Sequence, residues 1–316
     1  MTITEPGIYT MPMAAYLADP CPAPALSGGL AHTLLSASPL HAWTAHPRLN
    51  PGFVVDPPTP QQEEGTALHA LILENEDLTV PVDAPDWKSK AAQEARAAAR
   101  QAGKVAILKS RHAEIASIAE DVRHQLRYHD DAADCLSAGK PEQTMIWRDG
   151  PSWVRNRVDW LDDDPAGWLT DIKTVATTAE PGAFGRRLVD SGYAVSAALY
   201  LMGARALGRR PAGYRWLVIE REPPHAISVV AMAPDLMDLA ERQAMRALAI
   251  WRECMRGDMW PAYPPQTCWI EAPAWASMRW EEREERDQAA QRRTAKPRPF
   301  HEASDPRVVR SEMPFA

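Results

Sequence analysis

The sequence predicts an α/β fold with a mixed central β-sheet flanked by helices. Between residues 142 and 175, apolar and polar residues alternate with a period of two, which is typical of strands. The segments before and after this region repeat apolar residues with a period near 3.6, which is typical of helices that pack through one face. Strands and helices mixed in this way along one chain are typical of an α/β domain.

The length and composition are those of a globular protein with a substantial core. The chain has 316 residues, of which 45% are hydrophobic and 24% charged. No apolar run approaches the ~20 residues that a membrane span needs, and the first twenty residues lack a signal-peptide pattern, so we expect a cytoplasmic protein with no membrane partner. The four scattered cysteines indicate reduced thiols. The net charge of −7 gives no support of its own for nucleic-acid binding, which requires only local positive potential.

The N-terminal third is predicted to be irregular at first and then helical. Residues 1–29 are rich in proline and glycine, and we expect no regular structure there. A helix is expected over 31–36 and a second one after Ser38, a good N-cap followed by proline. A longer amphipathic helix follows over 61–76 and carries His69. A single histidine on such a helix is most often a core residue with one hydrogen-bond partner.

A helical insertion is expected over residues 87–127. Its first part is rich in alanine and charged residues, and its second part, from Ile107 to Leu126, shows an apolar stripe. Basic residues lie on the exposed faces but alternate with glutamates, which indicates a solvated surface more than a phosphate-binding one.

Three strands joined by turns are expected next, over 142–149, 153–161 and 168–175. Further helices are expected over 180–189 and 190–208, two strands over 214–220 and 226–232, and a helix over 234–257. From Glu281 the chain becomes highly charged, and we expect the last helix to dissolve into a disordered tail.

Acidic and basic side chains are brought together on the second and third of the three strands. Asp171 and Lys173 are two residues apart and therefore project from one face, and Asp159 comes from the adjacent strand. Two carboxylates bind a hard divalent cation through oxygen, and a lysine beside them can orient or deprotonate a metal-bound water. Alternatively, Asp-x-Lys is a short motif that also occurs on ordinary solvated strand faces.

The wider pattern favours the first interpretation. Arg-x-Arg-x-Asp, a turn, and an apolar strand ending in Asp-Ile-Lys-Thr resemble the core of the PD-(D/E)xK nuclease superfamily, and more closely the RecE-type phage and prophage exonucleases (exodeoxyribonuclease VIII-like). The segment 65–74 is similar to the helix of that family that carries a histidine. Residues 260–264 and 273–275 are similar to its Trp-Pro-x-Tyr-Pro and Pro-x-Trp ending. The resemblance implies a restriction-endonuclease-like nuclease domain over 30–280, followed by a charged tail over 281–316.

The resemblance also implies roles for individual residues. His69, Asp159 and Asp171 would bind one or two Mg²⁺ or Mn²⁺ ions, and Lys173 would stabilise the nucleophile or the developing charge. The secondary candidates at neighbouring motif positions are Glu142, Arg155, Arg157, Thr174, Tyr193, Ser196 and Tyr200. Of the two arginines, we expect one to neutralise the phosphate and the other to be structural.

One motif departs from the family pattern. Relatives carry Tyr-x-x-Gln-x-x-x-Tyr, whereas this chain has Tyr193, Ser196 and Tyr200, with serine in place of the glutamine. In relatives the glutamine assists at the metal and the scissile phosphate, so its loss bears on how water is positioned. The two tyrosines are equally compatible with helix-to-sheet packing.

The activity implied by the resemblance is a 5′→3′ exonuclease that acts on linear duplex DNA ends in phage-type recombination. It also implies a ring-shaped homo-oligomer and a single-strand annealing protein as partner. Two alternatives stay open, namely a related nuclease of different substrate or polarity, and a non-catalytic DNA-end-binding protein of the same fold. Ser196 favours the alternatives, whereas the intact set of Asp159, Asp171 and Lys173 favours catalysis.

Overall fold

The computed structural model describes residues 2–55, 57–74, 77–133 and 135–294. The chain separates into two compact units, residues 1–263 and residues 264–316. The second unit thus includes residues 264–280, which the sequence analysis assigned to the nuclease domain.

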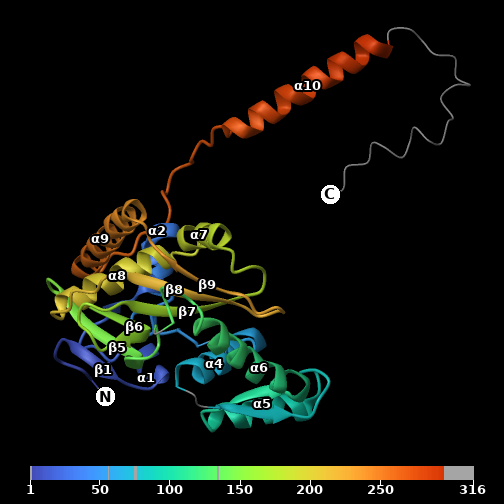
Figure 1. Ribbon diagram of the computed structural model, residues 1–316. Helices are drawn as coiled ribbons and strands as arrows, with labels where there is room; N and C mark the ends of the chain where they lie inside the picture. Colours follow the sequence, from blue (N-terminus) through green and yellow to red (C-terminus); the bar gives the residue numbers. More distant parts are fainter. Residues whose placement is uncertain (1, 56, 75–76, 134, 295–316) are drawn as a thin grey trace, which may run out of the picture. The chain divides into compact units, whose positions relative to one another are not determined.

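A mixed β-sheet of seven strands forms the centre of the first unit within the described residues (Figure 1). The strand order is β1-β5-β6-β7-β8-β9, and β2 pairs in parallel with β6. Strands β7 and β8 are also parallel, whereas the other neighbours are antiparallel. This arrangement confirms the predicted fold class. The strands are β1 (Gly7–Thr10), β2 (Ala25–Leu26), β5 (Gly139–Asp149), β6 (Ser152–Asp162), β7 (Leu169–Val175), β8 (Tyr214–Glu220) and β9 (Ile227–Ala231).

The ladder between β6 and β7 is short. These strands pair only at Trp160–Thr170 and Leu161–Leu169, whereas β5 and β6 pair along nearly their whole length. The inward alternation expected for β6 also changes here, because Val158 and Leu161 join one apolar cluster and Trp160 joins the other. Val158 and Trp160, which a strict period of two would place on one face, therefore lie in different clusters, and the change falls where β6 and β7 diverge at Asp159.

Helices cover both faces of the sheet (Figure 1). One apolar cluster joins the sheet to α2, α7, α8 and α9 around the fully buried Trp216 and Trp251. A second cluster joins the opposite face to α4 and α6 around Ile172 and Leu217. Because β8 is buried on both sides, its sequence is almost continuously apolar. The helices are α2 (Gly28–Ser36), α3 (Pro39–Thr44), α4 (Pro60–Leu73), α6 (Lys109–Leu126), α7 (Pro181–Asp190), α8 (Tyr193–Ala206) and α9 (Pro234–Gly257).

The insertion is not wholly helical, which corrects the expectation for residues 87–127. After α5 (Lys90–Gln101), Gly103 takes a φ of +69° and the chain enters strand β4 (Val105–Leu108). This strand pairs in parallel with β3 (Thr79–Val82) in a separate two-stranded sheet. A four-residue apolar run has no clear periodicity, so the sequence pattern could not distinguish a strand from the start of a helix.

The N-terminal segment is also more regular than expected. Residues 1–29 contain β1, the short helix α1 (Met13–Leu17) and β2. Strand β1 covers the edge of the sheet by pairing with β5, and both residues of β2 are buried against β6. Such short strands are stabilised by pairing with distant strands, which local sequence does not reveal.

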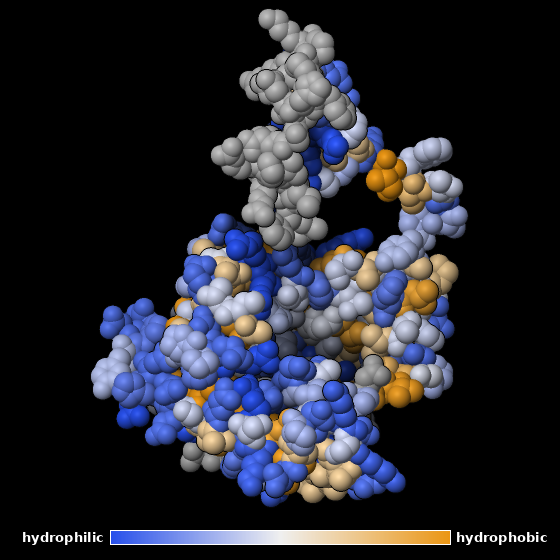
Figure 2. Space-filling model, turned by 90° about the vertical axis from the view of Figure 1, so that its right-hand side faces the viewer, coloured by the Kyte–Doolittle hydropathy of each residue, from blue (hydrophilic) through white to orange (hydrophobic). Residues whose placement is uncertain are grey.

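The second unit contains one long helix, α10 (Ala274–Thr294). The predicted continuation of helix past Glu281 is therefore present, whereas the disorder predicted for residues 295–316 lies outside the described residues. None of the described helices is long and apolar enough to cross a membrane. Figure 2 shows a molecular face that is mostly hydrophilic, with separate apolar patches between the polar side chains.

Candidate metal centre and active site

Asp159 occupies the point at which β6 and β7 diverge. Its Oδ2 accepts a hydrogen bond of 2.7 Å from the backbone nitrogen of Ile172 in β7. The carboxylate thereby satisfies a strand amide that the interrupted ladder leaves without a partner on β6. The divergence thus fixes an aspartate side chain between two strands, with 14% of that side chain exposed.

His69 reaches this carboxylate from α4. A capping box formed by Thr59 and Gln62 fixes the start of the helix, and Gly65 places the following turn beside Thr174 of β7. The His69 Nε2 atom lies 3.0 Å from Asp159 Oδ2. The predicted association of His69 with Asp159 is therefore present in the structure.

Glu142 completes a group of three ligand atoms. It lies opposite Asp159 between two ladder pairs of β5 and β6, and its Oε1 is 3.4 Å from His69 Nδ1. The donor atoms of His69, Glu142 and Asp159 all lie within 4.8 Å of one another. Glu142 has a φ of +54°, a left-handed conformation that costs a non-glycine residue about 1–3 kcal/mol and is concentrated at functional sites. We call His69, Glu142 and Asp159 the triad.

Asp171 and Lys173 form an ion pair beside the triad, and the Asp171 carboxyl is hydrogen-bonded to that of Asp159. Lys173 Nζ also lies 3.3 Å from the Ile172 carbonyl oxygen and 5.4 Å from the ring centroid of Tyr193. Glu142 joins His69 and Asp159 in the group of mutually close donor atoms, and Asp171 adjoins this group through Asp159. Asp171 still acts on Asp159, because each carboxyl changes the pKa of the other.

The pKa values of these groups reflect a buried set of opposite charges. Burial would lower the pKa of His69, but the charge of Asp159, followed by hydrogen bonds of His69 to Asp159 and Glu142, raises it to about 10. Burial would raise the pKa of Asp159, but His69 and then Lys173 hold it below its usual range.

The pKa values of Asp171 and Lys173 are both raised, whereas the pKa of Asp159 is lowered. Burial, followed by the charge of Asp159, raises the pKa of Asp171 to about 7. The pKa of Lys173 is raised above its ordinary value because the charges of Asp171 and Asp159 outweigh the effect of burial. Two neighbouring carboxyls with such different proton affinities are typical of functional sites.

The triad opens into a pocket of about 490 Å³. Arg157 and Met13 also line this pocket, so α1 of the N-terminal segment forms part of its wall. Two carboxylates and an imidazole suit Mn²⁺ and, through their oxygen atoms, Mg²⁺. The donor set therefore fits the divalent ion that the sequence analysis expected.

The secondary candidates lie in different surroundings. Arg157 contacts Glu142 directly, whereas Arg155 is buried among residues of the N-terminal segment. Thr174 lies against α4 near Gly65. Ser196 faces α2, because a Cβ built on Gly28 would lie only 2.8 Å from its Oγ. The short serine thus lets α2 and α8 approach closely.

The two motif tyrosines both lie near the Asp171–Lys173 pair. The ring of Tyr193 faces Lys173, while Tyr200 packs edge-on against Tyr214 at 5.8 Å between centroids. The pKa of Tyr200 is raised well above 10.0 by burial and then by nearby negative charges, which include those of Asp171 and Asp159.

Sequence reasoning missed two contributors to the site. Tyr214, at the start of β8, has its pKa raised well above 10.0 by burial and then by the charge of Asp171. Met13 enters the pocket wall from a segment that was expected to be irregular. Tyrosine at the start of an apolar strand was the only available signal for the first, and no motif indicated the second.

Comparison with known families gives a match over most of this domain. Residues 63–270 match the family described as a PDDEXK-like domain of unknown function (DUF3799). The chain belongs to this family. The match confirms the resemblance to the PD-(D/E)xK superfamily, and with it the nuclease-like fold. No curated protein matches the chain.

Three solved structures of similar chains are described as exonucleases. One is a candidate exonuclease from Eubacterium rectale, 11% identical, with a TM-score of 0.49 over 79% of this chain and 90% of that one. A phage-related exonuclease from Haemophilus somnus 129PT is 12% identical, with a TM-score of 0.28 over 61% of this chain and 95% of that one. An alkaline exonuclease from Laribacter hongkongensis is 13% identical, with a TM-score of 0.28 over 63% of this chain and 96% of that one. The assignment depends on the family match and not on these low similarities.

Proposed function

We propose that this protein is a divalent-metal-dependent exonuclease that hydrolyses phosphodiester bonds at the ends of linear duplex DNA. The observation that carries the proposal is the placement of the triad at the divergence of β6 and β7, with the Asp171–Lys173 pair beside it. A family with a nuclease-like fold supports DNA as the substrate class. Mg²⁺ or Mn²⁺ is the proposed ion.

Each group has a chemical role in this proposal. His69, Glu142 and Asp159 would hold the ion, and the ionised Asp171 carboxylate would be a further ligand beside Asp159. The ion would polarise the scissile phosphate and acidify a bound water. Lys173 stays protonated because its pKa is raised, so it orients the attacking water or stabilises developing negative charge instead of removing a proton.

The test is a cleavage assay with end-labelled linear duplex DNA and covalently closed circular DNA, in Mg²⁺, Mn²⁺ or chelator. We expect ion-dependent loss of the linear substrate alone. Lys173→Ala should lower the rate by about 10²–10³-fold, as the loss of one donor to a developing charge does in other enzymes. Lys88→Ala is the matched control, because the Lys88 side chain is 91% exposed and pairs with Asp86, away from the triad.

Each other outcome leads to a different function. Cleavage of circles would indicate an endonuclease of the same fold. Binding of DNA ends without cleavage, unchanged in Lys173→Ala, would contradict the enzymatic proposal. It would favour a non-catalytic DNA-end-binding protein, in which Ser196 replaces the glutamine that assists catalysis in relatives. The label that is released first gives the polarity.

The finer features of the RecE-type resemblance stay predictions. They are 5′→3′ polarity, a ring-shaped homo-oligomer, a single-strand annealing partner and a role in phage-type recombination. Sedimentation of the purified chain measures its oligomeric state directly.

A further inference from the structure

Two arginines of β6 connect this strand to the N-terminal segment. Arg157 Nη1 donates a hydrogen bond of 2.7 Å to the carbonyl oxygen of Met11. Arg155 Nη1 donates to the carbonyl oxygen of Tyr16. Both side chains are largely buried, with 10% and 4% of their surface exposed. The family match begins only at residue 63, so these contacts join the matched domain to a segment outside the match.

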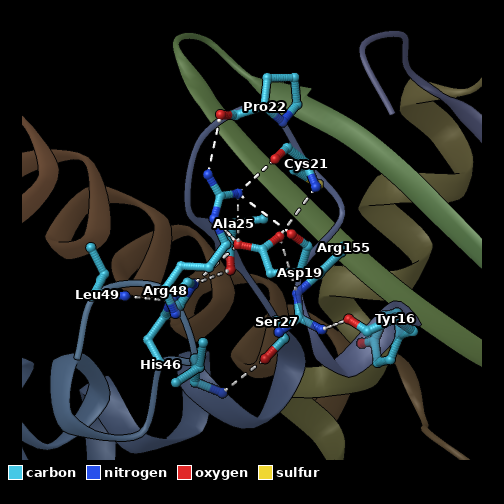
Figure 3. Close-up of polar contacts among 11 residues, drawn as sticks. Tyr16, Asp19, Cys21, Pro22, Ala25, Ser27, His46, Arg48, Leu49 and Arg155 are labelled. Atoms are coloured by element: carbon cyan, nitrogen blue, oxygen red, sulfur yellow. Dashed lines mark hydrogen bonds and ion pairs between the residues drawn. The ribbon is translucent and has the colours of Figure 1, made fainter. Parts of the chain in front are cut away.

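The two arginines differ in what else they contact. Arg157 Nε donates to Glu142 Oε2, and its Nη1 lies 3.5 Å from Thr144 Oγ1. Arg155 instead pairs with the buried Asp19, at 3.6 Å, and its guanidinium lies over the ring of Tyr16 (Figure 3). One arginine therefore contacts a member of the triad, and the other belongs to a separate buried cluster.

Glu142 has a strained backbone and a carboxylate with two contacts. Its left-handed φ of +54° is uncommon for a non-glycine residue and persists only where the surroundings hold it. One carboxylate oxygen contacts Arg157 and the other contacts His69. A continuous chain of contacts thus runs from the Met11 carbonyl through Arg157 and Glu142 to His69.

We propose that Arg157 is a positioning residue that uses the Met11 carbonyl to hold Glu142 in the geometry required for metal binding. The segment around Met11 is then part of the metal centre's support, although it supplies no ligand. This inference rests on the proposed metal site of the nuclease. The sequence led us to expect that one of Arg155 and Arg157 neutralises the phosphate and that the other is structural, and the proposal gives Arg157 a supporting role at the metal site.

The charge of Arg157 and its contact with Glu142 predict opposite effects on metal binding when Arg157 is replaced. Arg157 is a cation beside a metal ligand, so its charge alone disfavours a bound cation. Replacing it by a neutral residue would strengthen metal binding if charge were its only contribution. If Arg157 positions Glu142, the same replacement weakens binding, by about 10–100-fold as for other residues that support metal ligands.

The experiment is a titration of the full-length protein with Mn²⁺ in the absence of DNA, followed by calorimetry and by the electron paramagnetic resonance of bound Mn²⁺. We compare the wild type with Arg157→Lys, Arg157→Gln and the matched control Arg155→Lys. Both Arg157 variants should bind Mn²⁺ at least about tenfold more weakly. Arg155→Lys should keep the wild-type Mn²⁺ affinity and lower only the melting temperature.

Each contrary result overturns the inference in a distinct way. Unchanged or tighter Mn²⁺ binding by Arg157→Gln would show that position is not the role of Arg157. Weaker DNA binding with unchanged Mn²⁺ affinity would assign Arg157 to the phosphate, and an equal loss in Arg155→Lys would indicate a general structural effect. If Arg157→Lys does not fold, Arg157→Gln carries the comparison. Absence of Mn²⁺ binding by the wild type would instead contradict the proposed function itself.

Discussion

At the scale of single residues, the candidate site separates two kinds of acid. Asp159 and Glu142 lie with His69 around the pocket, whereas Asp171 is paired with Lys173. Because His69 is flanked by two carboxylates, it holds a proton more strongly in the metal-free protein than in water. A divalent ion bound to a ring nitrogen of His69 would have to displace a proton there, so protonation and metal binding would compete.

The raised pKa of His69 predicts that its contribution to stability depends on pH. The pKa of His69 is raised from 6.5 to about 10 in the folded protein. Its contribution is therefore fully present below pH 6.5 and is lost as the pH rises through 10. In chelator, the difference in unfolding free energy between wild type and His69→Asn should shrink between pH 7 and 10, as measured by urea denaturation.

A Mn²⁺ titration of the wild-type protein over the same pH range provides the control. The Mn²⁺ affinity of the wild type should rise over that pH range, because deprotonation frees the ligand nitrogen. A stability difference that does not change between pH 7 and 10 would show that His69 is not held as an imidazolium by the two carboxylates.

Residues of the site differ in how far the sequence could predict them. Strand periodicity places Asp171 and Lys173 on one face, because residues two apart project in the same direction, but their assignment to the site depended on the family resemblance. His69 depended on the family resemblance, since an isolated histidine on a helix has a simpler explanation in packing. The different environments of Arg155 and Arg157 depend on contacts with residues about 140 positions away, which no local pattern records.

At the scale of elements, α4 connects the triad to the insertion. Glu63 in its first turn is buried and pairs with Arg96 and Arg100 of α5, at 2.7 and 2.6 Å. Both arginines also donate to the carbonyl oxygen of Pro58, just before α4. The helix that presents His69 is thus attached at its start to the insertion by two guanidinium groups that share one carboxylate.

This attachment predicts a large effect for a small change. Glu63→Gln removes the charge of a buried carboxylate that two partly buried guanidinium groups share, and a hydrogen bond to a charged group contributes about 1.5–3 kcal/mol. We expect a destabilisation of this size in urea denaturation. Glu64→Gln is the control, because Glu64 and Arg111 are 3.4 Å apart and partly exposed, and such pairs contribute about 0–1 kcal/mol. Equal effects of the two substitutions would contradict the role assigned to Glu63.

Elements with strong periodicity were predicted well, and short ones were not. Strand β8 and helix α9 have the bounds that the sequence indicated, since each has a long apolar pattern and clear ends. Strands β1 and β4, of four residues each, form because a partner strand is available, at Met145 and Ile146 for β1 and at Val80 for β4. Their stability comes from pairing partners that the local sequence does not specify.

At the scale of the whole molecule, the site and all four apolar clusters lie in the first unit. The family match ends at residue 270, before α10, whose sequence is dominated by glutamate and arginine. A helix with so few large apolar residues adds little to a hydrophobic core. We therefore expect the nuclease-like domain to fold without α10.

This division predicts the outcome of a truncation after Ile270. The shortened chain should melt within a few degrees of the full chain, because the buried apolar area of the first unit is intact. It should also keep the Mn²⁺ affinity of the full chain, because His69, Glu142 and Asp159 are retained. Calorimetry of both chains measures the two quantities. A truncated chain that fails to fold, or binds Mn²⁺ more weakly, would place residues 271–316 within the folded domain. Unchanged folding and Mn²⁺ binding with reduced DNA affinity would assign the charged segment to the substrate, since its arginines can neutralise phosphates that the acidic chain otherwise repels.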